Sequence, residues 1–445
     1  MNNLSFSHIL LTISTLVVSI SCTVSDSSVS HTAPIVTETD SEYFHDYRNI
    51  DRIYEPYIRT VLLHPVDNPL LAPIIDLNSP AQLELRFDDL HGGFKDYWIS
   101  VTHCDYEWND SDLLASEYIQ GFQELMINDI EQSFNTVQNY TNYAINWPND
   151  MSKPMLSGNY ILKVYEEGYE EEPVFTRRIV VTEQLSRFRP QVKASTIVAD
   201  RRYRQEVDFD LIEAEYKLYD PYSDLEVAIL QNHRWDNAIT GLKPVFMKGT
   251  ELVYDFDEEN NFDGLNEFRW FDSKSLRYAA VGTDSIREIK GEWHYYLQPD
   301  LRRTYEVYRT DRDINGEFLI RNDDFDDHLE SQYIYTHFYL PFDEQLYQQE
   351  VYIIGGFNQW DHFEENRMTW NPRKKRYECT LYLKQGYYNY MYSIVSADHP
   401  NGTQAFIEGN HQMTENEYTI LAYYSDPAGY DRVIGVLTTD SFNGQ

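Results

Sequence analysis

The sequence contains few of the residue patterns that support chemistry, metal binding or membrane insertion. Its 445 residues include only three cysteines, so neither a disulfide framework nor a cysteine-rich zinc site is expected. It has no Gly-rich phosphate loop, no Gly-x-Ser-x-Gly turn and no metal-site spacing of His and Cys. After the N-terminal leader, no apolar run is long enough to cross a bilayer. These absences leave no residue to propose as catalytic, cofactor-binding or metal-binding, and no cofactor is expected.

Positive charge is also scarce. The chain has 36 Lys and Arg residues against 73 Asp and Glu, which gives a formal net charge of −37. A body this acidic repels phosphate backbones, so the composition argues against nucleic-acid binding. An anionic membrane surface would repel it as well. The charge is typical of a well-solvated surface and does not by itself indicate a recognition device.

The N-terminus indicates export. Ile9 to Ile20 is a continuous segment of apolar and small residues, too short to span a bilayer and typical of a signal peptide, which we place at residues 1–21. Ser19 to Cys22 resembles the cleavage box of bacterial lipoproteins, although Ser19 replaces the usual Leu. We therefore predict lipidation of Cys22, which would anchor the protein to a membrane without spanning it. Residues 22–44, rich in Ser, Thr and Val, are predicted to form a flexible tether.

Aromatic and strand-forming residues are abundant. Aromatic residues make up 15% of the chain, and 37 of them are Tyr. Short runs of alternating apolar and polar residues recur between turn residues, whereas long helical periods are few. A chain of this length holds roughly three domains. We predict an all-β protein of three consecutive β-sandwich domains, immunoglobulin-like or early-set-like, with short helical insertions; the domains are placed at residues 45–185, 186–322 and 323–437, with a loose tail at 438–445.

Individual strands are predicted wherever β-branched and aromatic residues alternate with polar ones. The main segments are 58–63, 83–87, 97–104, 160–165, 174–181, 207–212, 225–230, 252–256, 266–270, 305–308, 351–354, 377–383 and 387–394. One short helix is expected between the strands of the first block, capped at its start by Asp110 and Ser111, with Leu113 and Leu114 directed inward.

Two further motifs have a structural interpretation that we prefer. Asp311 to Gly316 matches the first half of a calcium-binding EF-hand loop, but its twelfth position is Asn322 instead of Glu and its flanks are expected to be strands. A hairpin turn at Asn315-Gly316 is favoured, because both residues tolerate positive φ. The adjacent His103 and Cys104 cannot form a nucleophile–base dyad, because neighbours on a strand point to opposite faces.

The predicted strands around two of the cysteines favour buried thiols over a disulfide. Cys104 and Cys379 are 275 positions apart and lie in different predicted domains. In an exported protein such a pair could form a bridge. Because strand patterns surround both residues, we expect two separate, buried thiols, and His103 beside the first of them is expected to be structural.

A stretch of the third block resembles the early-set β-sandwich of glycogen- and starch-binding modules. The resemblance rests on Gly355-Gly-Phe-Asn-Gln-Trp360 and Lys384-Gln-Gly-Tyr-Tyr-Asn-Tyr390. Exposed aromatic rings of such a module can stack on sugars. In many such domains the same residues fill the core instead, with Phe357 and Trp360 inside. The candidate residues for contact with a glycan or a partner are Trp360, Tyr387, Tyr388 and Tyr390.

A longer resemblance runs in order through the first two blocks. The segments that carry it are HCDYEW (103–108), SDLL (111–114), EYIQGF (117–122), SFNT (133–136), YTNY (140–143), SGNYILKVY (157–165), TRRIVV (176–181), ILQNHRWDNA (229–238), NEFRWFDSKSLRY (266–278) and DINGEF (313–318). Together they resemble the plug protein family of the type IX secretion system, which also has an early-set-like domain in the position of the third block.

The resemblance implies a periplasmic protein associated with the outer membrane. Its partner would be the very large translocon β-barrel of the type IX system, whose periplasmic opening it would plug while no cargo is engaged. No chemistry is needed for this function, only a rigid body with an interface of roughly 1,000 Å² or more. The alternative is an outer-membrane-tethered lipoprotein that binds glycans through the early-set-like domain.

Overall fold

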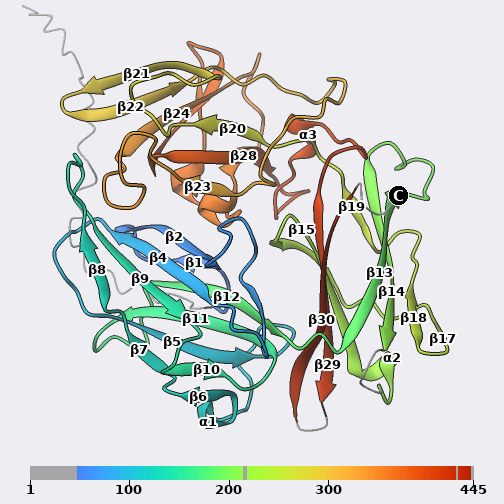
Figure 1. Cartoon of the computed structure of the whole chain (residues 1–445). Coiled ribbons are helices and arrows are strands. Elements are labelled where there is room, and N and C mark those ends of the chain that lie inside the picture. Colours follow the sequence, from blue (N-terminus) through green and yellow to red (C-terminus); the bar gives the residue numbers. More distant parts are fainter. Residues whose placement is uncertain (1–47, 214–217, 427–428, 442–445) are drawn as a thin grey trace, which may run out of the picture. The chain divides into compact units, whose positions relative to one another are not determined.

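The computed structural model describes residues 48–213, 218–426 and 429–441, and these residues form three β-sandwiches (Figure 1). The all-β prediction is confirmed. The helical segments of the described residues are short: α1 (Ala115–Tyr118), α2 (Pro221–Asp224), α3 (Ala405–Glu408) and the 3-10 turns η1 (Gly356–Asn358) and η2 (Glu364–Asn366). Among these described helices, none has the length and apolarity that a bilayer crossing requires. The predicted signal peptide, the tether and Cys22 lie outside the described residues.

The first sandwich packs two antiparallel sheets around one apolar core. One sheet has the order β1-β12-β11-β5-β7, with β3 added in parallel to β12, and the other has the order β2-β4-β9-β8. Along β5, Tyr97, Ile99 and Val101 alternate inward as predicted and are fully buried. The strands are β1 (Arg52–Ile53), β2 (Ile58–Pro65), β3 (Ile74–Asp76), β4 (Leu83–Asp89), β5 (Tyr97–Cys104), β7 (Glu124–Met126), β8 (Asp129–Gln132), β9 (Thr141–Trp147), β11 (Gly158–Glu166) and β12 (Phe175–Thr182), with a separate pair, β6 (Ile119–Gly121) and β10 (Ser152–Pro154).

The second sandwich is assembled from two distant parts of the chain. Its first sheet has the order β13-β14-β18-β17, with β19 beside β14, and its second has the order β16-β15-β29-β30. One core joins both sheets and includes Val207, Ile229 and Ile420. The strands are β13 (Ser186–Ala194), β14 (Arg204–Glu213), β15 (Leu225–Gln231), β16 (Arg234–Thr240), β17 (Phe246–Lys248), β18 (Glu251–Tyr254), β19 (Asn261–Asp263), β29 (Glu417–Asp426) and β30 (Tyr430–Asp440).

The third sandwich lies, in sequence, within the second. Its first sheet is centred on β28, which pairs with β20, β23 and β25, and its second has the order β21-β22-β24-β27-β26. Phe271, Phe338 and Tyr388 meet in its core. The strands are β20 (Arg269–Asp272), β21 (Thr283–Ile289), β22 (Glu292–Leu297), β23 (Phe318–Ile320), β24 (Tyr333–Pro341), β25 (Glu350–Ile354), β26 (Thr369–Asn371), β27 (Arg376–Lys384) and β28 (Gly386–Val395).

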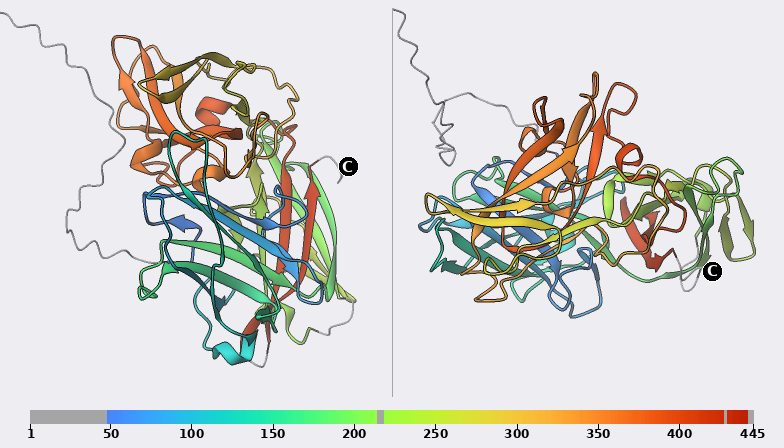
Figure 2. Two further views of the ribbon diagram at one scale, coloured as in Figure 1. Left: turned by 60° about the vertical axis from the view of Figure 1, so that its left-hand side comes forward. Right: turned by 90° about the horizontal axis from the view of Figure 1, so that it is seen from above.

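The second and third sandwiches therefore do not coincide with the expected domains at residues 186–322 and 323–437. Figures 1 and 2 show the red hairpin β29–β30 within the green second sandwich, where β29 pairs with β15. The strands β20 to β23 belong to the third sandwich, because β20 and β23 pair with β28 and β22 pairs with β24. The expected loose tail also begins too early, since residues 438–440 are part of β30; residues 442–445 lie outside the described residues.

Three local predictions in irregular segments are wrong. Residues 305–308 form no strand, because no neighbouring strand pairs with them. Helix α1 begins after Leu114 instead of at Asp110-Ser111, and Leu114 is exposed. Asn315 and Gly316 do adopt the expected turn, with φ of 53° and 87°, but no hairpin results, because the segment before the turn is not a strand. Instead Asn389 of β28 accepts hydrogen bonds from the backbone N–H groups of Ile314 and Gly316.

Buried polar contacts join the first and third sandwiches. The Nζ of Lys384 lies 2.7 Å from the Oδ2 of Asp88, and both side chains are almost fully buried. The hydroxyl of Tyr333 donates to the same Asp88 oxygen at 2.7 Å. Burial lowers the pKa of Lys384, and the charge of Asp88 opposes this shift. Because ionised groups out of water need matched partners, this contact fixes the relative register of the two sandwiches.

An apolar cluster joins the first and second sandwiches. It consists of buried residues from the outer faces of β5, β11 and β12 on one side and of β15, β29 and β30 on the other. Its members include Cys104, Ile161, Leu230 and Leu421. At its edge the hydroxyl of Tyr423 donates to the Oδ1 of Asn159 at 3.0 Å. The described body is therefore held together by packed contacts between its sandwiches and not by flexible linkers.

Candidate functional site: an exposed loop on a buried polar network

Trp360, a predicted contact residue, is buried and serves packing. The guanidinium of Arg234 lies 4.4 Å from its ring centroid, and the ring of Phe268 meets it edge-on at 5.6 Å. A Cβ atom at Gly316 would lie 2.1 Å from the indole, so glycine at that turn is required by close approach as well as by positive φ. Because its ring faces are covered, Trp360 cannot stack on a sugar. The structure agrees with the alternative prediction, in which Trp360 packs inside the domain.

The tyrosines of the same prediction are also largely withdrawn from solvent. Tyr388 stacks on Phe271 with ring centroids 4.9 Å apart, inside the core of the third sandwich. Tyr390 is buried, and Tyr387 is half-buried against Trp270, at 5.7 Å. Of the four candidate contact residues, Trp360, Tyr388 and Tyr390 are therefore unavailable to a glycan or a partner, and Tyr387 alone keeps part of its ring at the surface.

Tyr390 has a different role, as a support for the segment that follows β22. Its hydroxyl and that of Tyr392 both donate to the Oδ2 of Asp300, each at 2.7 Å. The Nη1 of Arg269, on β20, binds the other oxygen of Asp300 at 2.9 Å. The backbone N–H of Asp300 donates to the carbonyl of Tyr339 at 2.8 Å. Asp300 is thus fixed from both sheets of the third sandwich.

A second carboxylate extends this network to α3. Glu408 is fully buried and accepts hydrogen bonds from Arg269 and from Arg303, the latter at 2.6 Å from its Nη2. Burial alone would raise the pKa of Glu408, but the charges of Arg269 and Arg303 outweigh it and hold the pKa below its usual range. The buried carboxylate of Glu408 is thus matched by two guanidinium groups, as buried charges must be.

The network carries a long loop without regular structure, residues 298–313, which we call the Tyr305 loop. Beyond Asp300 it is attached through the backbone N–H of Arg303, which donates to Ile407 of α3 at 2.8 Å, and through Thr304, which donates to Phe406. Farther on, the hydroxyl of Tyr308 donates to Glu267. The loop displays Leu301, Tyr305 and Val307, of which Tyr305 is 93% and Val307 86% exposed.

One feature of the sequence could have identified this loop, but we predicted a strand there instead. Residues 302–312 hold four arginines in a chain with only 36 basic residues among 445. Arg and Tyr together are characteristic of interface hot spots. The strand prediction for 305–308 came from the β-propensity of Tyr and Val, which does not distinguish a paired strand from an exposed loop.

A second group of exposed apolar side chains lies on the small pair β6–β10 of the first sandwich. Phe122 follows β6 and its N–H donates to the carbonyl of Met151 at 2.8 Å, while the N–H of Met155 donates to Tyr118 of α1. Leu114, Phe122, Met151 and Met155 are all exposed. Exposed apolar side chains of this kind are candidate contacts with a partner.

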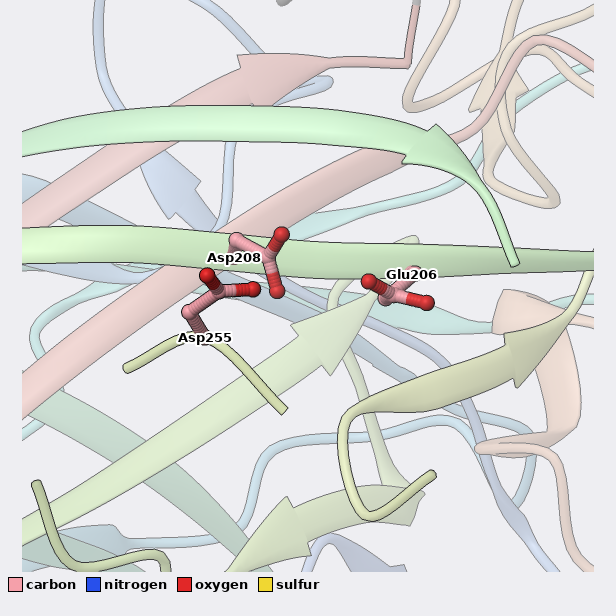
Figure 3. Close-up of side chains that lie close together, drawn as sticks. All are labelled: Glu206, Asp208 and Asp255. Atoms are coloured by element: carbon pink, nitrogen blue, oxygen red, sulfur yellow. The ribbon is translucent and has the colours of Figure 1, made fainter. Parts of the chain in front are cut away.

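An acidic cluster on the second sandwich has the geometry of a cation site. Glu206 and Asp208 of β14 lie beside Asp255, as Figure 3 shows, with carboxylate oxygens within 4.8 Å of one another. The ammonium of Lys193 already lies among them, 3.0 Å from Glu206 and in close contact with Asp208. Burial opposes the charge of Lys193, but these hydrogen bonds outweigh it and raise its pKa. The chain thus supplies its own cation to the cluster.

The predicted buried thiols and structural histidine are confirmed. Cys104 and Cys379 are free and buried, and burial raises the pKa of each thiol to about 12, which keeps both unreactive. His103 is fully buried with its Nε2 3.2 Å from the carbonyl of Ser157. Burial lowers its pKa. A Cβ atom at Gly158 would lie 2.2 Å from the His103 ring, so the buried position of His103 requires glycine at position 158.

A cavity of about 670 Å³ lies where the three sandwiches meet. Its lining includes Arg177 and Arg178 as well as Asp51, Asp236 and Glu317. The lining therefore carries charges of both signs.

Comparisons with known proteins agree with the resemblance found in the sequence. Residues 58–183, which include every strand of the first sandwich except β1, match the family model of the type 9 secretion system plug protein 1st domain. A crystal structure of a hypothetical protein from Parabacteroides merdae is 32% identical; the match covers 88% of this chain and 100% of that one, with a TM-score of 0.85. Collagen adhesin from S. aureus aligns at 6% identity and a TM-score of 0.11, which carries no argument. No curated protein matches.

The match therefore covers the sandwich that contains the most motifs of the resemblance, and a solved structure of similar sequence has the same fold over nearly the whole chain. The family is one of non-enzymatic components of type IX secretion, and it places the protein in the cell envelope. The chain belongs to the type 9 secretion system plug protein family.

Proposed function

We propose that the protein plugs the periplasmic opening of the outer-membrane translocon barrel of the type IX secretion system when no cargo is engaged. The observation that carries the proposal is the match of residues 58–183 to the first domain of the plug family. The protein acts through bulk and surface and performs no reaction. It resides in the periplasm at the outer membrane, and lipidation of Cys22 provides an anchor there.

The way the sandwiches are joined supports this function. A plug has to keep its shape while it covers the opening. A chain of domains that move independently would not keep a fixed shape. Here the buried pair of Asp88 and Lys384 and the apolar cluster that includes Cys104 and Leu421 hold the sandwiches to one another. Release on demand requires moderate affinity, which related complexes tune mainly through the dissociation rate.

Deletion of the gene in the native host tests the proposal. We expect the outer membrane to become permeable to a large antibiotic that intact cells exclude, and we expect re-expression of the wild-type protein to restore the barrier. The control is a strain that also lacks the barrel, in which deletion should have no effect. Unchanged permeability, together with no barrel recovered on the tagged protein, would show the proposal to be wrong.

The glycan-binding alternative gains no support from the residues that suggested it. Trp360, Tyr388 and Tyr390 are buried and only Tyr387 keeps part of its ring at the surface. Sugar stacking needs an exposed ring face. The alternative therefore lacks the exposed ring platform that it requires.

A further inference from the structure

We propose that the cavity between the three sandwiches binds a short peptide with free ends, whose carboxylate lies at Arg178 and whose ammonium group lies at Glu317. Plugging a pore needs no ligand, so this site is additional to the proposed function. Three features of the cavity indicate such a ligand: its size, two charged groups on its walls that have no counterion, and its apolar lining.

The cavity is large enough for a ligand of more than one residue. Its volume of about 670 Å³ falls within the range of about 300–1,000 Å³ that is usual for ligand sites. Its walls come from all three sandwiches, since Arg178 lies on β12, Trp235 lies on β16, and Glu317 directly precedes β23. A free amino acid carries both of its charged groups on one carbon atom and would fill only a small part of this space.

The first sandwich supplies positive charge without a counterion. The Nε of Arg178 donates to the carbonyl of Asn49 at 3.0 Å, but the two Nη groups of Arg178 form no hydrogen bond or ion pair with any described residue. The guanidinium lies 4.4 Å and 5.2 Å from the ring centroids of Trp108 and Trp235, which hold it in place. The adjacent Arg177 also has no ion pair within the described part of the chain, and burial lowers the pKa of both arginines.

The third sandwich supplies a carboxylate without a donor. Glu317 follows the turn at Gly316 and packs against Gly356, where a Cβ atom would lie 2.7 Å from the Oε2 of Glu317. No described residue donates a hydrogen bond to this carboxylate or forms an ion pair with it. Burial raises the pKa of Glu317, and the charge of His233 opposes this shift. His233 does not act as its counterion, because its Nε2 is in contact with Glu417.

The other carboxylates of the lining are already engaged. Asp236 pairs with Arg234 at 2.6 Å. Asp51 and Asp361 each accept a backbone N–H group at 2.8 Å, and the charge of Asp51 also opposes the lowering of the pKa of both arginines. Glu317 is therefore the lining carboxylate that no donor of the described residues reaches.

Charges of both signs determine the class of ligand. A simple anion would be repelled by Glu317, and a simple cation would be repelled by Arg178. Among the described residues, the carboxylates of the cavity do not form a group of three within 4.8 Å of one another, so they do not indicate a metal site. A dipolar molecule satisfies both walls, since Arg forms strong charge-assisted hydrogen bonds with a carboxylate and Glu accepts them from an ammonium group. Leu71, Trp235 and Phe318 in the same lining provide apolar contacts for the side chains of a peptide.

Titration calorimetry of the full-length protein with tri-alanine tests this site. N-acetyl-tri-alanine lacks the ammonium group and tri-alanine amide lacks the carboxylate, so each blocked peptide removes one of the two proposed contacts. We expect wild type to bind tri-alanine and to bind each blocked peptide about ten-fold or more weakly, because hydrogen bonds between charged groups are among the strongest.

Two variants identify the residue at each end. Glu317→Gln keeps the size of the side chain and removes its charge, so it should bind tri-alanine and the acetylated peptide equally while still preferring a free carboxylate. Arg178→Gln should show the reverse pattern, and the exposed Glu344→Gln should bind like wild type. A purely structural role of Glu317 or Arg178 would weaken all three peptides alike and would not produce this crossed pattern.

Three outcomes would overturn the proposed site. One is the absence of both binding heat and a rise in melting temperature when tri-alanine is added to wild type, since a ligand of the folded state stabilises it. The second is equal binding of all three peptides by wild type, because the charged groups would then select nothing. The third is tighter binding of free alanine than of tri-alanine, which would assign the cavity to a single amino acid. None of these results bears on the proposed plugging of the barrel, which the permeability of the deletion strain tests separately.

Discussion

Asp88 and Lys384 illustrate how much one buried pair can determine. The two side chains come from different sandwiches, are almost fully buried and lie 2.7 Å apart. Such a pair adds little stability relative to apolar residues of the same size, but loss of one partner leaves the other charged and without solvent. Tyr140 and Tyr333 surround the same ammonium, whose Nζ lies 4.1 Å from the Tyr140 ring centroid. The contact therefore fixes how the first and third sandwiches align with each other.

Replacing Lys384 with Met should lower the free energy of unfolding by about 3–5 kcal/mol, because Asp88 would remain buried without its cation. Chemical denaturation monitored by tryptophan fluorescence measures the change. The matched control is Lys374→Met, which removes an exposed partner of Glu378 at 3.2 Å and should cost about 0–1 kcal/mol. Equal effects of the two substitutions would contradict the role assigned to the buried pair.

Glu267 predicts a pH dependence of stability. Burial raises its pKa from 4.5 to about 7, although hydrogen bonds from Tyr308 and from the backbone N–H of Glu415 oppose the shift. Between these two values the folded protein keeps a proton that the unfolded chain has lost, so this group's contribution to stability falls as the pH rises from 4.5 to 7. The loss amounts to about 3 kcal/mol at most, at about 1.4 kcal/mol per pKa unit.

Glu267→Gln should therefore flatten the decline in stability over that pH range relative to wild type. Denaturation midpoints measured at pH values on both sides of the range, near pH 5 and near pH 8, give the comparison. The exposed Glu344→Gln is the control and should keep the wild-type profile. A variant Glu267→Gln that declines as steeply as wild type would assign the pH dependence to other groups, such as Asp313, whose pKa burial raises to about 6.

At the scale of the elements, the strands were predictable and their partners were not. Alternation and β-propensity correctly indicated strands such as β5, β15 and β25, because both signals are local. The pairing of β29 with β15 joins residues nearly 200 positions apart, as Glu226 and Tyr423 do, and no local pattern specifies it. Strand registers depend on which faces are buried together, so the sequence alone placed the domain boundaries wrongly.

The buried tyrosines show the same limit for the candidate site. Tyr387, Tyr388 and Tyr390 were candidate contact residues because they belong to a motif that resembles glycan-binding modules. Tyr388 and Tyr390 have the same strand face and are buried, whereas Tyr387 points to the other face and is half-buried. Whether a given face of a strand is core or surface is decided by the sheet that packs on it, and that information was absent from the motif.

Removal of the C-terminal hairpin should unfold the second sandwich. A chain truncated after Asn416 lacks β29 and β30, which form half of one sheet and contribute Tyr418, Ile420 and Ile434 to the core. We expect rapid proteolytic cleavage within residues 186–260, while the third sandwich stays resistant. Under the sequence-based boundaries the second domain would be complete without the hairpin, so persistence of a protected fragment over that region would contradict the observed topology.

At the scale of the whole molecule, the sandwiches of the described body should unfold together. Domains that share only a linker melt independently, but here the second sandwich encloses the third in sequence and buried contacts connect both to the first. We expect one calorimetric transition in wild type, with a calorimetric enthalpy close to the van't Hoff value. Lys384→Met should lower the temperature of this one transition, since the pair with Asp88 connects the first and third sandwiches, whereas Lys374→Met should leave it unchanged. Two or more transitions in wild type would show that the sandwiches move independently, and a rigid stopper would then need its partner to align them.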